Sequence, residues 1–347
     1  MPLDRDPKCV LLVGAGRFAA YYINALAEIS RPNRSGPEFV GKLIVTKTDL
    51  QQARRLADEI HQRHPVSFGT VIGAQVRAVD GLTVLLAEHA PHLTCITARD
   101  RRQGDAIHAA YTSAALAHGA VLCEKPFNSV QGDGTSLAAL VGIQESSWAG
   151  RFGLELPMAV VGREMWRHPV LGPLLERARR IDFLWERPLD GPTGLLEDLA
   201  LHPWSLLMGG GRRMWVRRVD EGQRTASIQL EWLPINRRRP VRCRIRLRSS
   251  GRFRGMALDD QCLSFGYHEG RMVVFQLTSD LDSAAANPGT HMGTSVMTVE
   301  NPLKQQILSL QAGRPVVGIE TALASQRFLE ALVAHSRGAA LAFDAAG

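Results

Sequence analysis

Short apolar runs alternate with amphipathic stretches over the first part of the chain. Five segments are rich in apolar residues and too short for helices, which predicts buried parallel strands over 9–13, 42–45, 70–76, 93–97 and 121–123. The stretches between them repeat apolar residues at helical spacing and predict helices over 17–30, 50–61, 80–89 and 103–118. Strands that alternate with helices favour βαβ units around a parallel sheet.

The pattern changes after residue 150. Apolar and polar positions alternate there with a period of two, which predicts strands over 179–187, 212–219, 226–233, 242–247, 261–267 and 272–277. Little helix separates the last five strands, so we expect a mostly antiparallel sheet. A helical pair is expected at 302–312 and 320–337, and residues 283–295 predict a mobile loop. We therefore expect two domains, 1–128 and 129–347, with the last helices free to pack back on the first domain.

The first predicted strand runs into residues 14–19 (GAGRFA), a G-x-G-x-x-A turn that opens a helix. Gly14 permits the tight turn, Gly16 lets a pyrophosphate approach the backbone, and Ala19 lets helix and strand pack closely. The helix N-terminus offers N–H groups and the positive end of its dipole to phosphates. Because the motif follows a strand and begins a βαβ series, it predicts a Rossmann-type dinucleotide site rather than a simple turn.

The end of the second predicted strand indicates which dinucleotide binds. NAD enzymes usually carry an Asp or Glu there, which binds the ribose 2′-hydroxyl. This chain has Thr46, Lys47 and Thr48 instead. A cation and hydroxyl groups suit a 2′-phosphate, which a carboxylate would repel, so we expect NADP in preference to NAD. The alternative is an ordinary solvated lysine in a loop.

Charge and cysteine content restrict the partners. The chain of 347 residues has a formal net charge of +7, and its arginines concentrate in residues 236–248 (NRRRPVRCRIRLR). Apolar residues alternate with arginines over 241–248, so we expect a strand with one basic face that meets solvent or another subunit. An acidic partner or substrate is the alternative. We expect no nucleic-acid partner, because zinc-finger spacing and aromatic stacking motifs are both missing from the sequence.

The five cysteines are scattered, odd in number and without a Cys-x-x-Cys pair. We therefore expect a reduced, cytoplasmic protein without a structural metal. No stretch approaches the roughly 20 apolar residues that span a bilayer, and the first residues show no signal-peptide pattern, so no membrane partner is expected.

Two motifs carry candidate chemistry. The fifth predicted strand runs into Glu124-Lys125-Pro126, at the sheet edge where α/β proteins bind ligands. Asp198 and His202 stand four residues apart in GLLEDLALH (194–202), a spacing that places both on one helix face. A histidine with a carboxylate nearby can deliver the proton that a carbonyl or imine needs when it accepts a hydride. The alternatives are a surface lysine, a structural histidine and a helix surface charge.

The glycine turn, the Val-Leu-Cys-Glu-Lys-Pro stretch and GLLEDLALH together resemble the glucose–fructose oxidoreductase and inositol dehydrogenase family. The resemblance covers nearly the whole chain and implies an N-terminal Rossmann domain followed by an α+β domain with an open, mostly antiparallel sheet. It implies NAD(P)-dependent hydride transfer on a small carbonyl, alcohol or imine substrate. Lys125 would then lie between nicotinamide and substrate and stabilise developing charge, and Asp198 and His202 would point back at the cofactor. Subunits would associate as dimers or tetramers through the second sheet.

The expected site therefore has two groups of residues. The expected catalytic residues are Lys125, Asp198 and His202. The expected cofactor-binding residues are Gly14, Gly16, Arg17, Phe18, Thr46, Lys47, Thr97, Arg99, Glu124 and Lys125. One departure from the family, residues 97–102 (TARDRR) after the fourth predicted strand, makes a standard sugar substrate doubtful. A non-catalytic NADP-binding sensor of the same fold is the alternative function.

Overall fold

A computed structural model of the chain describes residues 8–16, 18–31, 40–98, 107–127, 135–189, 194–268 and 270–338, apart from the side chains of residues 135, 136 and 212. The chain forms two compact units. Unit 1 draws on three stretches, 1–128, 134–155 and 303–322, and unit 2 contains mainly 156–302 and the residues from 323 onward. The division into domains 1–128 and 129–347 stays a prediction, because the two compact units are each made of more than one stretch of the chain.

Unit 1 is built on a parallel sheet of six strands in the order β3-β2-β1-β4-β5-β6. Its strands are β1 (Lys8–Val13), β2 (Val40–Lys47), β3 (Phe68–Gln75), β4 (Leu93–Ile96), β5 (Ala120–Glu124) and β6 (Phe152–Glu155). This order is that of the doubly wound dinucleotide-binding fold. The predicted Rossmann sheet is thereby confirmed.

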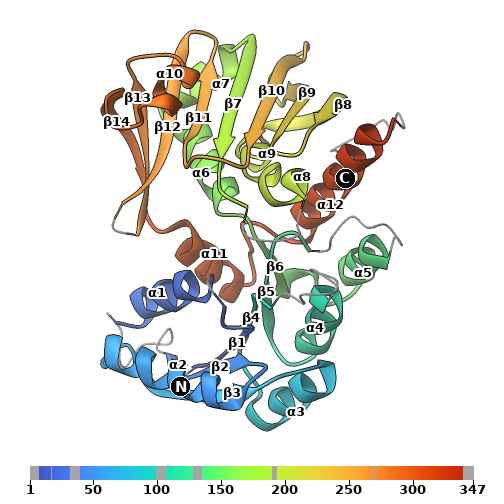
Figure 1. Cartoon of the computed structure of the whole chain (residues 1–347). Helices are drawn as coiled ribbons and strands as arrows, with labels where there is room; N and C mark the ends of the chain where they lie inside the picture. Colours follow the sequence, from blue (N-terminus) through green and yellow to red (C-terminus); the bar gives the residue numbers. More distant parts are fainter. Residues whose placement is uncertain are drawn as a thin grey trace, which may run out of the picture. The chain divides into compact units, whose positions relative to one another are not determined.

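Helices cover both faces of this sheet. In Figure 1, α1 and α2 lie to one side of the strands and α3, α4 and α5 to the other. Their bounds are α1 (Ala19–Ser30), α2 (Leu50–Arg63), α3 (Val79–His89), α4 (Ile107–Leu116) and α5 (Thr135–Gln144), and a short 3₁₀ turn follows at Ala149–Arg151. From the far end of the sequence, α11 (Pro302–Gln311) adds Leu303, Ile307 and Leu310 to the core around β1 and α1.

Unit 2 is built on an eight-stranded sheet in the order β14-β13-β12-β11-β7-β10-β9-β8. Its strands are β7 (Arg180–Glu186), β8 (Gly211–Glu221), β9 (Thr225–Pro234), β10 (Val241–Arg248), β11 (Arg254–Leu258), β12 (Gln261–His268), β13 (Arg271–Leu277) and β14 (Met292–Val299). All neighbours pair antiparallel except β7 and β10, which are parallel. The predicted mostly antiparallel sheet is thereby confirmed.

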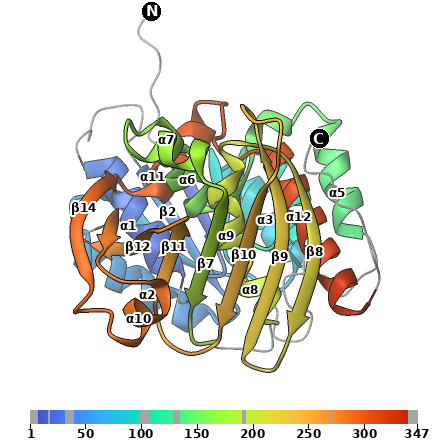
Figure 2. The same cartoon turned by 90° about the horizontal axis from the view of Figure 1, so that it is seen from above.

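Figure 2 shows one face of this sheet toward the viewer; α10 packs on that face beside β11, and most of the other helices of unit 2 lie behind the sheet. The helices are α6 (Pro157–Arg167), α7 (Leu171–Arg177), α8 (Leu195–Leu199), α9 (Leu201–Met208), α10 (Leu281–Ala286) and α12 (Ile319–Ser336), whose first residues belong to unit 1. Along β10, apolar residues are buried and the four arginines are exposed or half-buried, as the sequence predicts. We call the face with the arginines the open face.

The structure corrects two local predictions. Residues 283–295 are not one loop, because they include most of α10 and the start of β14. GLLEDLALH does not form one regular helix either: α8 and α9 meet at Ala200, whose backbone stays in the right-handed helical region. The strands β6, β11 and β14 were not predicted from the sequence; each of them is short or lies at the edge of its sheet.

Candidate functional site

The glycine turn follows β1 and is fixed from two neighbouring strands. Gly14 has φ +83°, and a Cβ built on it would lie 2.2 Å from Ala98 Cα, so only glycine fits. The Gly14 N–H donates to Thr46 Oγ1 at 3.1 Å, and Thr97 Oγ1 donates to Gly14 O at 2.7 Å. Thr46 and Thr97 are both buried, so these predicted cofactor residues hold the turn itself.

The next part of the turn is open. Gly16 is exposed, and a Cβ on it would meet only Gly14 O, at 3.8 Å. Phe18 occupies the N-cap position of α1 and makes no side-chain cap hydrogen bond. Ala19 N donates to Gly16 O at 3.1 Å and Tyr21 N donates to Phe18 O at 3.0 Å, so the turn offers a pyrophosphate the open backbone at Gly16 and the positive end of the α1 dipole. Arg17 lies outside the described residues.

The loop after β2 carries cations and no unengaged carboxylate in its described part. Lys47 is half-buried at the end of β2. The carbonyl of Thr48 accepts hydrogen bonds from Gln75 Nε2 at 2.7 Å and from Arg77 Nε at 3.3 Å, which brings Arg77 to this loop. Asp49 Oδ1 accepts from Gln52 N at 2.8 Å and caps α2. Lys47 and Arg77 are thus the cations, and Asp49 the carboxylate, that lie at this loop.

Lys125 follows β5 directly. Its side chain is 4% exposed, and Glu124 before it is buried as well. Glu124 is the cross-strand partner of Glu155 on β6. Burial raises the pKa of the nearby Tyr22 well above its ordinary value, and the carboxylates of Glu155 and Glu124 raise it further. The end of β5 is therefore a buried polar region of unit 1.

In unit 2, the predicted pair is placed by α8, α9 and β7. Asp198 is 6% exposed, and its Oδ2 lies 3.9 Å from Arg187 Nη1. His202 stacks on Trp185, with ring centroids 5.7 Å apart and planes inclined by 9°. An ion pair thus constrains Asp198, and an aromatic ring supports the His202 imidazole.

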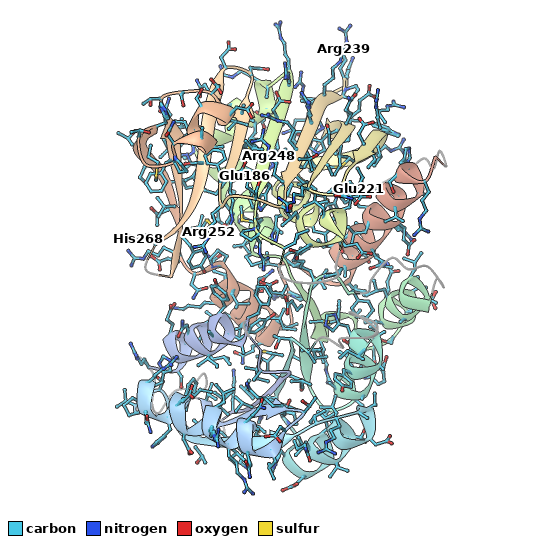
Figure 3. The ribbon with its side chains drawn as sticks, viewed as in Figure 1. Glu186, Glu221, Arg239, Arg248, Arg252 and His268 are labelled. Carbon is cyan, nitrogen blue, oxygen red and sulfur yellow. The ribbon has the colours of Figure 1, made fainter. Side chains whose placement is uncertain are left out.

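Trp185 belongs to a row of side chains across the covered face of the sheet. Its antiparallel neighbour Arg254 on β11 places its guanidinium carbon 5.9 Å from the Trp185 ring centroid. The Phe265 ring, on β12 beyond β11, has its centroid 5.9 Å from that of Trp185. On the opposite face, Glu186 contacts Arg248 at 3.1 Å, and Figure 3 shows these two side by side. The Trp185 ring on which His202 stacks is thus itself contacted by one aromatic and one basic side chain.

The structure brings together Gly14, Thr46 and Thr97 in unit 1, and Asp198, His202, Trp185 and Arg187 in unit 2. Arg99 lies outside the described residues. Sequence reasoning missed Arg77, His108 and Trp185. Two of them could have been found from the sequence with difficulty: Arg77 directly follows the predicted third strand, and His108 is a polar residue at a buried position of a helix.

Among the described residues, no three His, Cys, Asp or Glu side chains gather as metal ligands, and no helix is long and apolar enough to cross a membrane. All five cysteines are free thiols.

No family model and no curated protein sequence matches the chain. Solved structures do. An NAD-binding oxidoreductase from Klebsiella pneumoniae is 15% identical, covers 96% of this chain and 98% of its own, and has a TM-score of 0.62. An oxidoreductase domain protein from Kribbella flavida is 15% identical, covers 96% and 97%, and has a TM-score of 0.61.

A levoglucosan dehydrogenase in complex with NADH and levoglucosan is 11% identical to this chain. It covers 99% of this chain and 100% of its own, with a TM-score of 0.64. The chain has the fold of these oxidoreductases. The similarity extends over both units and agrees with the family resemblance read from the motifs.

Proposed function

We propose that the protein is an NADP-dependent oxidoreductase that transfers a hydride between the cofactor and a small carbonyl, alcohol or imine substrate. The observation that carries this proposal is the glycine turn. Gly14 is locked against Ala98, Gly16 is open, and the N-terminus of α1 follows at the carboxyl edge of a doubly wound sheet. The oxidoreductases that share the fold support it.

The 2′-phosphate would be held by Lys47 together with Arg77. Both belong to the edge formed by β2 and β3, and Arg77 is anchored through its Nε to the Thr48 carbonyl. The nearest carboxylate, that of Asp49, is engaged as the cap of α2. A levoglucosan dehydrogenase of this fold is in complex with NADH, and the preference for NADP proposed here depends on Lys47 and Arg77.

The bound nicotinamide supplies or accepts the hydride. Lys125 would stabilise the negative charge that develops on the substrate oxygen or nitrogen. His202 would deliver the proton, and Trp185 would keep its ring in one orientation. Asp198, paired with Arg187, would orient His202 or bind a polar group of the substrate.

The open face of the unit 2 sheet would join copies of this chain into dimers or tetramers. Around Arg180 and Asp182 on β7 the face divides into two depressions of unlike charge. One depression, of about 630 Å³, is lined by Arg246 and by four further aspartates, Asp259, Asp260, Asp280 and Asp282. The other carries Arg217, Arg242 and Arg244 with Glu231. A two-fold axis near β7 would set each basic half on the acidic half of the partner.

The free thiols suit a reducing compartment, and we place the protein in the cytoplasm. Burial raises the pKa of the Cys95 and Cys243 thiols, which keeps them protonated and unreactive.

The decisive experiment is cofactor binding by Gly16→Ala, measured through NADPH fluorescence. The added methyl group meets only Gly14 O at 3.8 Å in the protein, so we expect unchanged thermal stability. It would stand where the pyrophosphate approaches, so we expect the Kd for NADPH to rise at least about tenfold, equivalent to about 1.4 kcal/mol.

The matched control is Gly142→Ala, an exposed glycine in α5 with open space around it. This variant should bind NADPH like the parent. Equal binding by the parent and Gly16→Ala would contradict the proposed cofactor site. NADPH oxidation tested against sugars, keto acids, cyclic imines and tetrapyrroles then identifies the substrate. Tight NADPH binding without turnover on any of them would favour the non-catalytic sensor.

A further inference from the structure

A buried histidine lies behind the candidate cofactor site. His108 is in the first turn of α4 and is 0% exposed. Its Nδ1 lies 3.0 Å from Pro126 O, and its Nε2 lies 2.8 Å from Ala98 O. Both ring nitrogens therefore face backbone carbonyl oxygens at hydrogen-bond distance.

Both contacts are to carbonyl oxygens, which favours a ring that carries a proton on each nitrogen. A carbonyl oxygen accepts hydrogen bonds and cannot donate them, so each contact requires an N–H on the imidazole side. A neutral imidazole has one N–H and would leave its other nitrogen lone pair facing an oxygen lone pair. The imidazolium has two N–H groups and satisfies both carbonyls with charge-assisted hydrogen bonds.

The two carbonyls belong to the two turns that matter most in unit 1. Ala98 follows β4 and packs against Gly14, where it leaves no space for a Cβ. Pro126 follows Lys125 at the end of β5. His108 thus bridges the turn that would hold the cofactor phosphates and the turn that carries Lys125.

We propose that His108, as a doubly protonated imidazolium, is a positioning residue that fixes Lys125 relative to the glycine turn. The role of Lys125 rests on the proposed function, and this inference adds to that function a residue that positions Lys125. Without the bridge, the Pro126 carbonyl loses its donor and the backbone on either side of Lys125 is free to shift. A displacement of about 1 Å at a reacting group costs on the order of 10²-fold in rate.

The charge on the ring is tested without cofactor or substrate. The protein is labelled with ¹⁵N at its histidine rings, and the His108 signals are assigned by their loss in His108→Gln. We expect protons on both ring nitrogens at pH 7. A His108 ring with one unprotonated nitrogen at that pH would overturn the proposal.

The positioning role is tested at Lys125. The chain has five lysines, Lys8, Lys42, Lys47, Lys125 and Lys304, so ¹³Cε-lysine labelling gives a simple spectrum in which Lys125→Met assigns the signal. We expect His108→Leu and His108→Gln to shift the Lys125 signal more than the other four. The control is His118→Gln, an exposed histidine on the turn after α4, which should leave Lys125 unchanged.

Kinetics provides the second measurement. On the substrate found for the parent, His108→Leu should lower kcat by about 10²-fold, with KM and the Kd for NADPH changed by less than about threefold. His108→Gln retains an amide donor for one carbonyl and should recover part of kcat. Full kcat in either variant, or a loss seen only in thermal stability, would overturn the proposal.

The two proposals can fail separately. If the parent does not oxidise NADPH with any of the substrates tested, the proposed function fails. The ¹⁵N and ¹³C spectra then still decide the role of His108. If His108→Leu does not fold, His108→Gln carries both spectroscopic tests. A Lys125 signal that moves no more than the other four in His108→Gln then contradicts the inference.

Discussion

The side chains at the glycine turn have two different roles: some stabilise the turn itself, and others are placed to bind a ligand. Thr46 and Thr97 fix the backbone of Gly14: the Gly14 N–H donates to Thr46 Oγ1, and Thr97 Oγ1 donates to the Gly14 carbonyl oxygen. Lys47 comes next in sequence after Thr46, and among the described residues of the turn none is hydrogen-bonded to its side chain. Substitutions at these two adjacent residues should therefore differ in effect. A substitution of Thr46 should lower the stability of the protein, and a substitution of Lys47 should change the choice of cofactor.

Replacing Lys47 by aspartate should reverse the cofactor preference. The carboxylate repels a 2′-phosphate and can bind the ribose hydroxyl instead. We expect the Kd for NADPH to rise by about 10- to 100-fold, equivalent to about 1.4–2.7 kcal/mol, while the Kd for NADH changes little or falls. Arg77→Gln should weaken NADPH in the same sense. Lys304→Asp serves as the control, and a parallel shift of both Kd values in Lys47→Asp would refute the assignment.

Lys125→Met and His202→Ala should each lower kcat by about 10²–10⁴-fold, the usual cost of removing a positioned proton donor. Neither residue belongs to the glycine turn, so the Kd for NADPH should change little. The double variant should lose less than the product of the two single losses, because groups that act as a unit are not additive. Steady-state kinetics on the true substrate checks this, and full turnover by His202→Ala would show that the proton comes from elsewhere.

Local motifs made part of the site predictable at this scale. Gly14 and Gly16 stand in a recognisable order after a strand, and Lys125 directly follows one. Trp185 and His108 could not be predicted in their roles, since nothing near Trp185 in sequence indicates His202, and nothing near His108 indicates the Ala98 and Pro126 carbonyls. Those contacts arise only from the tertiary fold.

Among the elements, β10 and α10 together form one electrostatic structure on the open face. Arg246 Nη1 lies 2.6 Å from Asp282 Oδ2, and Arg248 bridges Asp282 at 2.8 Å and Glu186 at 3.1 Å. Leu281 and Ala284 of α10 pack in an apolar cluster with Leu184 of β7. The short helix is thus attached by both apolar contact and charge.

Asp282→Asn should destabilise the protein in a pH-dependent way. The hydrogen bond from Arg246 lowers the pKa of Asp282, so the ionised carboxylate favours the folded state. This stabilisation is complete above the unfolded-state pKa of about 3.9 and is lost as the pH falls through the lower folded-state pKa. The side chain is half exposed, so we expect about 0.2–1 kcal/mol at pH 7.

Urea unfolding of the parent and Asp282→Asn at pH 7 and pH 3 measures the effect. The difference in free energy of unfolding should shrink at pH 3. Asp260→Asn, in the turn between β11 and β12, is the control and should show no comparable loss at pH 7. A difference that grows toward low pH would contradict the sign of this argument.

The sequence predicted β10 well because one face of that strand is buried and the other is charged along its full length. It failed for β14, of which the first four residues are all exposed, so that no alternation of burial marks them. It failed for α10 because a six-residue helix gives too short a repeat. Pattern arguments thus succeed for longer segments with a single buried face, and they fail for short elements and for segments without an alternation of burial.

For the molecule as a whole, charge on the open face should control self-association. Reversal of Arg242 and Arg244 to glutamate places acids against the partner's acidic half. We expect this variant to be monomeric in analytical ultracentrifugation under conditions where the parent forms dimers or tetramers, and we expect parent association to weaken with added salt. Arg337→Glu, on the last described turn, is the control. Unchanged association in the double variant would exclude this face.

Unit 1 is made of three separate stretches of chain, and this arrangement determines when the protein can fold in the cell. Leu303, Ile307 and Leu310 complete the core around β1, and Leu154 N donates to Val317 O at 3.0 Å. A ribosome adding about 5–20 residues per second needs roughly 7–30 s to go from residue 155 to residue 303. Through that interval the nascent first unit exposes the apolar surface that α11 later covers, so its assembly is delayed until residues 303–322 have been synthesised.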